Sequence, residues 1–212
     1  MSIILGINKD HSDSSACLLI NGELVGAVAE ERLGKRIKHD SSFPVNSIKW
    51  LIKSNNLKYS DINHIAVSND PMSNFIPKML HSFDFSSFNL FKKIKNKYYN
   101  RSSIKKEITN LCKDTGEDVN NLRFKIINVE HHLTHIASAF YLSKFKDKTA
   151  AFTYDGSGDA VSITLAECHD NKIKILEKVF LPKSLGHVYA AICNYIGFKT
   201  FGEEYKDMGL SA

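Results

Sequence analysis

Two histidines, His131 and His135, have the spacing in this sequence that points most directly to chemistry. They are four residues apart in a segment with helical periodicity, so they share one helix face with Cβ atoms about 5–6 Å apart. Two neutral imidazoles at that separation can bind one transition-metal ion. His132 stands where a zinc metalloprotease requires Glu, and it points roughly 100° around the helix, so it is not expected to be a third ligand. The alternative is a pair of hydrogen-bonded or exposed histidines without a metal.

Asp155 follows the apolar segment 150–154, which has the pattern of a buried strand. A carboxylate in that place is costly unless it has an ionic partner, so Asp155 is a candidate oxygen ligand beside the two histidines. Two imidazoles and one carboxylate leave open positions on a metal, as catalytic sites do. The next residues, Gly156, Ser157 and Gly158, would let backbone amides approach a phosphate or carboxylate. An ordinary strand-ending turn over 155–159 is the alternative.

Two polar segments near the N-terminus are further candidates. The turn at 8–15 contains His11, a possible general base, among carboxylates and hydroxyls. An ordinary polar turn would have the same composition. The charged segment 30–39, which includes Lys38, predicts either a basic lip for an anionic substrate or a solvated strand exit.

The elements that must position these residues follow a pattern that occurs twice. In each copy a strand, a polar turn, a second strand, a turn, a third strand and a helix follow one another. The predicted strands are 3–7, 16–20, 24–29, 62–67, 123–129, 149–154, 160–166 and 173–180, and the predicted helices begin at Pro44, at about His131 and at Leu185. This predicts an α/β fold of two duplicated domains that face each other across a cleft, with the second copy incomplete.

The expected first domain covers 1–148 and the expected second domain begins at 149–212. The first would carry a helical insertion at about 71–118 with a basic face, because phenylalanines alternate there with lysines. Interleaved aromatic and basic residues can bind nucleic acid. A solvated helix face over an apolar stripe explains the periodic spacing better, so no nucleic-acid partner is expected.

Composition narrows the class of protein. The chain has 212 residues, a net charge of +5 and 43% apolar residues, which is typical of globular proteins. Its four cysteines contain no C-x-x-C pair, so a disulfide framework or zinc knuckle is not expected. No apolar run approaches the roughly 20 residues of a membrane span, and no signal peptide is evident. We therefore expect a cytoplasmic protein without a membrane partner.

Five motifs in order resemble the N-terminal part of the O-carbamoyltransferases, a family that includes nodulation-factor and antibiotic-tailoring enzymes. The motifs are Gly6-Ile7-x3-His11-x-Asp13-Ser14-Ser15-Ala16; Glu30-Glu31-Arg32 with Lys38-His39 and Phe43-Pro44; Glu130-His131-His132-x2-His135-x2-Ser138-Ala139-Phe140; Asp155-Gly156-x-Gly158-Asp159; and Gly202-Glu203-Glu204-Tyr205-Lys206-x-Met208-Gly209-Leu210. The resemblance covers nearly the whole chain except the insertion.

The resemblance implies an actin/sugar-kinase-like (RNase H-like) fold related to the tRNA threonylcarbamoyl transferases. It implies that carbamoyl phosphate and ATP give carbamoyl-adenylate, and that the carbamoyl group then passes to a hydroxyl of a small-molecule acceptor. By motif position, His131, His135 and Asp155 would bind a divalent metal, with Fe²⁺ expected and Zn²⁺ or Mn²⁺ as alternatives. His11 would lie near the reacting groups as a possible base, and Lys38 would contact the adenylate or phosphate.

The resemblance also implies parts that this sequence does not contain. In the family, a further aspartate ligand and a separate adenylate-forming domain follow the point that corresponds to Ala212. We therefore expect a C-terminal domain in cis or in trans, and expect the 212 residues alone to bind metal weakly and not to complete the reaction. Two alternatives remain: an ATP-dependent phosphotransferase or ATPase of the same superfamily, and a non-catalytic remnant.

Overall fold

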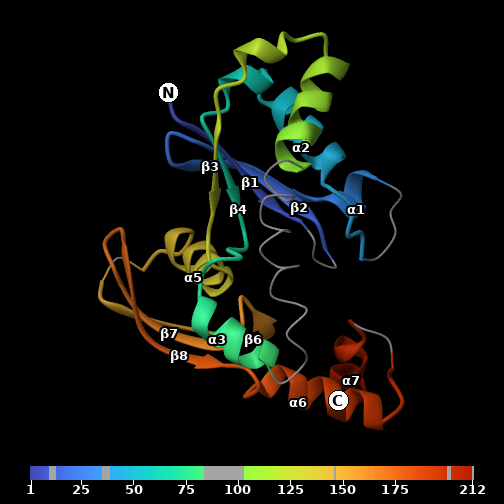
Figure 1. Ribbon diagram of the computed structural model, residues 1–212, viewed down its shortest axis with the longest axis vertical. Helices are drawn as coiled ribbons and strands as arrows, with labels where there is room; N and C mark the ends of the chain where they lie inside the picture. The colour runs from blue at the N-terminus through green and yellow to red at the C-terminus, as the bar shows by residue number, and fades with distance from the viewer. Residues whose placement is uncertain (10–12, 35–38, 84–102, 146, 200–201, 212) are drawn as a thin grey trace. The chain divides into compact units, whose positions relative to one another are not determined.

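The computed structural model describes all residues except 10–12, 35–38, 84–102, 146, 200–201 and 212 (Figure 1). Contacts divide the described chain into two compact units. The first contains Met1–Pro71 and the described part of Phe88–Val129. The second contains the described part of Met72–Ser87 together with Glu130–Ala212. The predicted His11 and Lys38, and much of the predicted insertion, lie outside the described residues.

The first unit is built on a five-stranded sheet of order β3-β2-β1-β4-β5 (Figure 1). Its strands are β1 Ile3–Asn8, β2 Ser15–Ile20, β3 Glu23–Ala29, β4 His64–Val67 and β5 Lys125–Asn128. The first three are antiparallel, whereas β4 pairs in parallel with β1, and β5 pairs in parallel with β4. Asn21 and Gly22 join β2 to β3 with φ of 52° and 90°, as a two-residue hairpin turn requires.

Helices pack on the sheet of the first unit through one apolar cluster. The helical and 3₁₀ elements are α1 Glu30–Leu33, α2 Val45–Ser54, η1 Tyr59–Asp61, a helix over residues 103–114, and η2 Val119–Asn121. Leu5 and Leu18 from the strands, Ile48 and Leu51 from α2, and Ile108 from the helix at 103–114 are almost fully buried in this cluster. The alternating pattern of the strands and the helical period of α2 therefore meet in one core, as the sequence predicts.

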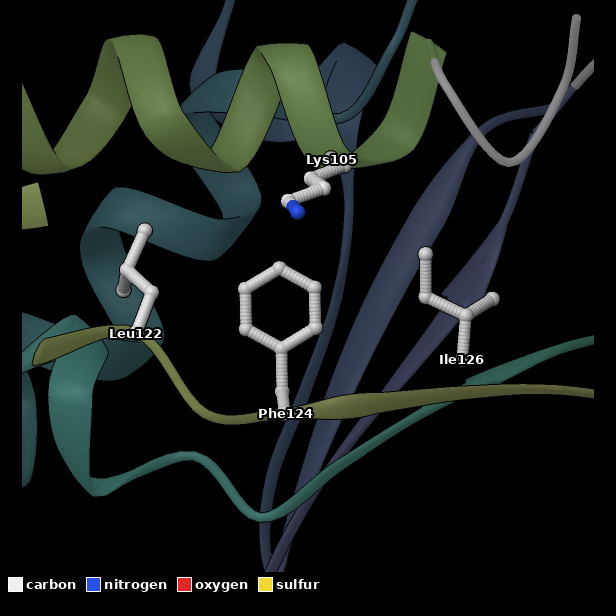
Figure 2. A pocket seen from close by; sticks show the side chains of 4 residues that line it. All are labelled: Lys105, Leu122, Phe124 and Ile126. Carbon is white, nitrogen blue, oxygen red and sulfur yellow. The ribbon is translucent and has the colours of Figure 1, made fainter. Parts of the chain in front are cut away.

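A pocket of about 270 Å³ lies in the first unit between the helix at 103–114 and the chain around β5. Figure 2 shows the Lys105 side chain ending above the Phe124 ring, with Leu122 and Ile126 on either side. None of the candidate site residues from the sequence lines it.

The second unit is a three-stranded antiparallel sheet with helices against it (Figure 1). Its elements are α3 Phe75–Phe83, α5 His131–Tyr141, β6 Thr149–Gly158, β7 Val161–His169, β8 Lys172–Phe180, α6 Leu185–Tyr195 and α7 Glu204–Leu210. Helix α5 packs on β6 and β7, and its buried Ile136 and Phe140 meet Ala166 and Cys168 of the sheet. Helix α6 packs on β6. The sheet thus holds α5, which carries the histidine pair.

The predicted turn at 155–159 is wrong in its position. Strand β6 continues through Gly158, and the register between Tyr154 and Gly158 is shifted by a bulge. The turn to β7 falls instead on Asp159 and Ala160, which have φ of 52° and 66°. A glycine-rich segment can adopt either a bulge or a turn, and here pairing of Gly158 with Val161 of β7 extends the strand.

The described strands and helices follow one another in the order that the sequence predicts. The boundary between the compact units differs from the expected 148/149, because α5 makes its contacts with β6 and β7. Among the described helices, none combines the length and apolar character needed to cross a bilayer.

Candidate metal centre

The side chains of His131, His135 and Asp155 converge on one point in the second unit. His131 Nε2 lies 3.0 Å from Asp155 Oδ2 and 3.0 Å from His135 Nε2, and His135 Nε2 lies 3.7 Å from Asp155 Oδ2. The structure therefore brings together the three residues that the sequence predicts as metal ligands. Among the described His, Cys, Asp and Glu residues, these three form the one group with the spacing of a metal site.

Hydrogen bonds alone cannot satisfy all the contacts among these three side chains. His131 Nε2 lies within hydrogen-bond distance of both a carboxylate oxygen and a second imidazole nitrogen. A neutral imidazole nitrogen either donates one proton or accepts one, so one of its two contacts is left without a hydrogen bond. A divalent cation can accept the lone pairs of all three atoms at once.

The distances between the three donor atoms also fit one shared metal ion. Two donors about 2.1 Å from a metal lie about 3.0 Å apart at a right angle and about 3.4 Å apart at the tetrahedral angle. The observed 3.0, 3.0 and 3.7 Å lie around these values. The His135 side chain is 52% exposed and that of His131 only 16%, so the group is open to solvent on the His135 side. Positions for further ligands are therefore accessible from that side.

The first turn of α5 holds His131 in place. Glu130 caps the helix, since its Oε2 accepts a hydrogen bond from the N–H of Leu133 at 2.9 Å. The N–H of His131 itself donates to Asp159 Oδ2 at 2.9 Å. Because His135 lies one turn further along the same helix, fixing this turn also places the second imidazole.

Strand β6 supplies the Asp155 carboxylate and Gly158, which packs against the His131 ring. Asp155 lies in the bulged part of β6, and bulges re-aim side chains in this way. Gly158 is buried beneath His131, and a Cβ atom built on it would come within 1.9 Å of the imidazole Cδ2 and 2.7 Å of the His131 Cβ. Glycine at 158 is therefore a packing requirement of the histidine ring.

The electrostatics keep Asp155 ionised. Contact with His131 and, second, His135 lowers the pKa of its carboxyl far below the usual range, and these contacts outweigh the opposing effect of burial. Its other oxygen, Oδ1, accepts a hydrogen bond from the N–H of Gly156 at 2.6 Å. An anionic oxygen is thus held beside two imidazoles, which is the form that binds a cation.

His132 faces away from this group, as its place on the helix predicts. It is fully buried, its Nδ1 lies 2.8 Å from Thr153 Oγ1, and its Nε2 lies 2.9 Å from the carbonyl oxygen of Val161. Since a carbonyl only accepts, Nε2 donates and Nδ1 accepts from the hydroxyl. Burial lowers the pKa of this imidazole, which favours the neutral form. His132 therefore fastens α5 to β6 and β7.

The predicted anion-binding segment has several of its groups engaged within the second unit. The N–H of Gly156 bonds to Asp155, and its carbonyl accepts from Ser184 Oγ at 2.7 Å. A Cβ on Gly186 would lie 2.6 Å from the Gly156 nitrogen, so the start of α6 approaches β6 very closely. Ser157 is exposed.

Sequence reasoning missed several residues around the site. They are Asp159 in the β6–β7 turn, Lys78 on α3, and Ser184 and Gly186 at the start of α6. Asp159 is part of the motif quoted for the family resemblance, which is the signal that could have found it. For Lys78 the sequence offers no comparable signal, because it lies 81 residues from its partner Asp159.

Comparisons with known proteins find relatives that are longer than this chain. A protein named sll1178 from Synechocystis is 32% identical over 221 residues, which are all of this chain and 34% of that protein. The nodulation protein NolNO from Sinorhizobium fredii is 32% identical over 199 residues, which are 94% of this chain and 27% of that protein. The chain therefore spans about a third or less of the length of these relatives.

Solved structures give weaker likenesses. YeaZ from Pseudomonas aeruginosa has a TM-score of 0.45 at 12% identity, and covers 86% of this chain and 68% of its own. A Ppx/GppA phosphatase from Aquifex aeolicus has a TM-score of 0.39 at 13% identity, and covers 98% of this chain and 60% of its own. Values of this size leave the family assignment to the sequence match.

The family model described as the carbamoyltransferase N-terminus matches residues 3–212. This range includes all three residues of the candidate metal centre and the polar segments that contain His11 and Lys38. The chain therefore belongs to the carbamoyltransferase family, of which it matches the N-terminal part.

Proposed function

We propose that this chain forms the transfer site of a carbamoyltransferase, which moves a carbamoyl group from carbamoyl-adenylate to a hydroxyl of a small molecule. The observation that carries the proposal is the convergence of His131, His135 and Asp155 within hydrogen-bonding distance of one another or close to it. Membership of the carbamoyltransferase family supports the choice of reaction.

The proposed transfer exchanges one C–O bond for another. The bond between the carbamoyl carbon and the adenylate oxygen breaks, a bond to the acceptor oxygen forms, and the hydroxyl proton leaves. The products are a carbamate ester and AMP. A divalent metal, when bound, would polarise the carbamoyl carbonyl as a Lewis acid.

His131, His135 and Asp155 would hold this metal. Two imidazoles and one carboxylate with open positions are a donor set that suits Fe²⁺, and Zn²⁺ or Mn²⁺ are alternatives. The proposal draws support from the exposure of His135, since acceptor and donor need access from the solvent side. Holding both substrates at one site would also supply the proximity that a two-substrate transfer needs.

Other roles are proposed from the family resemblance. His11 would take the proton of the acceptor hydroxyl, and Lys38 would contact the adenylate phosphate. Ser157 is a candidate for the same anion because its side chain is exposed beside the metal ligands. For Gly156 and Gly158, the contacts within the second unit favour support of Asp155 and His131 over direct contact with a nucleotide.

We further propose that both units are actin/sugar-kinase-like domains and that a C-terminal domain makes carbamoyl-adenylate from carbamoyl phosphate and ATP. The shared order of three antiparallel strands and a helix supports the first point. The length of the relatives supports the second, since this chain spans about a third of them or less. The protein would bind ATP and carbamoyl phosphate in the cytoplasm, which is the location that we propose for it.

The test uses the whole product of the gene that encodes this chain, with carbamoyl phosphate, ATP and a panel of hydroxyl acceptors. We expect a carbamate ester and AMP, and we expect His131→Ala/His135→Ala to lower the transfer rate at least about 100-fold, because metal-ion catalysis supplies several kcal/mol. His169→Ala serves as the matched control, since that side chain is exposed and forms an ion pair with its neighbour Asp170.

Two results would count against the proposal. Carbamate formation that is unchanged in the double histidine variant would remove the metal centre from the reaction. Phosphorylation of an acceptor or release of ADP, without any carbamate ester, would favour the phosphotransferase or ATPase of the same superfamily.

A further inference from the structure

The first turn of α5 is surrounded by charged side chains that the proposed reaction does not use. Asp159 and Lys78 have side chains that are 7% and 14% exposed, and the side chains of Glu130 and Lys178 are 10% and 21% exposed. Charged side chains so well shielded from water are costly unless they are paired. Each of these carboxylates has a lysine beside it.

Asp159 connects α3 to the main chain of a candidate metal ligand. Its Oδ1 receives a hydrogen bond from Lys78 Nζ at 2.8 Å, and its Oδ2 receives one from the N–H of His131 at 2.9 Å. Asp159 lies in the β6–β7 turn with φ of 52°, directly after Gly158. One carboxylate therefore ties α3, the turn and the first residue of α5 together.

Glu130 provides a second anchor in the same turn of the helix. Its Oε2 accepts from the N–H of Leu133 at 2.9 Å, and its Oε1 lies 3.4 Å from Asn74 Nδ2 and 3.6 Å from Lys178 Nζ. Asn74 joins the two anchors, because its amide also donates to the carbonyl oxygen of Asp159 at 3.2 Å. Two of the N–H groups left unpaired at a helix start are thus satisfied by fixed carboxylates.

The His131 ring has little room to adapt if this turn moves. The ring lies directly over Gly158, where even a methyl group would overlap it. Metal–ligand distances tolerate changes of only about 0.2 Å. The position of the main chain at His131 therefore decides whether its Nε2 meets the other two donors.

We propose that Asp159, held by Lys78, is a positioning residue that fixes His131 for metal binding. This inference rests on the proposed metal centre and adds the residues that set its geometry. It also gives a role to α3, which is the described start of the predicted basic insertion and belongs by its contacts to the second unit. In this proposal Lys78 acts on the metal site through Asp159, to which its Nζ donates a hydrogen bond.

The test measures Co²⁺ binding to the whole product of the gene that encodes this chain, by its visible absorption. We expect Lys78→Met and Asp159→Ala to weaken Co²⁺ affinity roughly 10- to 100-fold, as loss of outer partners of metal ligands does, and to change the absorption bands. Asp159→Asn should retain more affinity, because its side-chain oxygen can still accept from the N–H of His131. Lys148→Met is the control, since it removes an exposed ion pair with Glu167 at the other end of the same sheet.

A second measurement separates positioning from general loss of structure. Amide hydrogen exchange without metal should quicken at His131 in Lys78→Met and Asp159→Ala, with far-UV circular dichroism unchanged. Parental Co²⁺ affinity, absorption bands and exchange in both folded variants would overturn the inference. No Co²⁺ binding by the parent chain and the control would instead refute the metal centre, and with it this inference.

Discussion

A methyl group on Gly158 should destroy the metal centre, whereas the same change at Gly156 should not. A Cβ at 158 would lie 1.9 Å from Cδ2 and 2.2 Å from Cγ of His131, and ordinary contact begins near 3.4 Å. The ring would have to retreat by about 1.5 Å, which is several times the roughly 0.2 Å that metal–ligand bonds tolerate. Among the described residues, a Cβ at 156 would approach His187, at 3.6 Å.

We therefore expect Gly158→Ala to lower metal affinity by roughly 100-fold or more, because the site would keep two donors of three. Gly156→Ala should bind within about threefold of the parent, since its new contact is an ordinary one. The assay is a competitive titration of Co²⁺ or Fe²⁺ against a chelator, on both variants side by side under anaerobic conditions.

The pair of variants also decides what the glycines are for. If both glycines served to bring backbone amides to a phosphate, neither change would alter the affinity for metal. Parental metal affinity in Gly158→Ala would refute the packing argument. Equal loss in both variants would show that the β6 bulge, rather than the ring contact, governs the site.

Three further predictions concern stability. Removal of metal with a chelator should lower the free energy of unfolding by about 2.7 kcal/mol when free metal had been at 100 times Kd, and should have no effect on His131→Ala/His135→Ala in thermal unfolding. His132→Leu should cost about 2–4 kcal/mol in metal-free protein, because the carbonyl of Val161 and a hydroxyl lose their buried partner; a melting temperature equal to that of His169→Ala would contradict this. Gly186→Ala should cost about 1–3 kcal/mol, because its Cβ would overlap the backbone of β6; unchanged denaturant unfolding would refute the close approach.

Much of the local structure could be predicted because it depends on periodic patterns. The alternation over β1 and the helical period over α2 each place apolar side chains on one face, and the two faces form the core. The convergence of His131 and His135, the candidate metal ligands, could be predicted in the same way, since four-residue spacing places them together. Asp155 joined the candidates because a carboxylate at the end of an apolar segment is costly unless it has an ionic partner.

What could not be predicted depends on contacts between distant segments. A glycine-rich run is compatible with an anion nest, a turn or a bulge, and only pairing with β7 selects the bulge. Ala160 has φ of 66°, a left-handed conformation that is uncommon for alanine, so its residue type does not predict a turn there. Lys78 meets Asp159 across 81 residues of sequence, and no spacing rule connects them.

The measurement that tests the central claim most directly is the metal content of the whole product of the gene that encodes this chain, purified anaerobically and analysed by elemental mass spectrometry beside its His131→Ala/His135→Ala variant. The convergence of these two residues with Asp155 predicts about one equivalent of iron, zinc or manganese in the parent and none in the variant. Metal retained by the variant, or absent from the parent even after incubation with Fe²⁺, Zn²⁺ or Mn²⁺, would contradict a metal centre at these three residues.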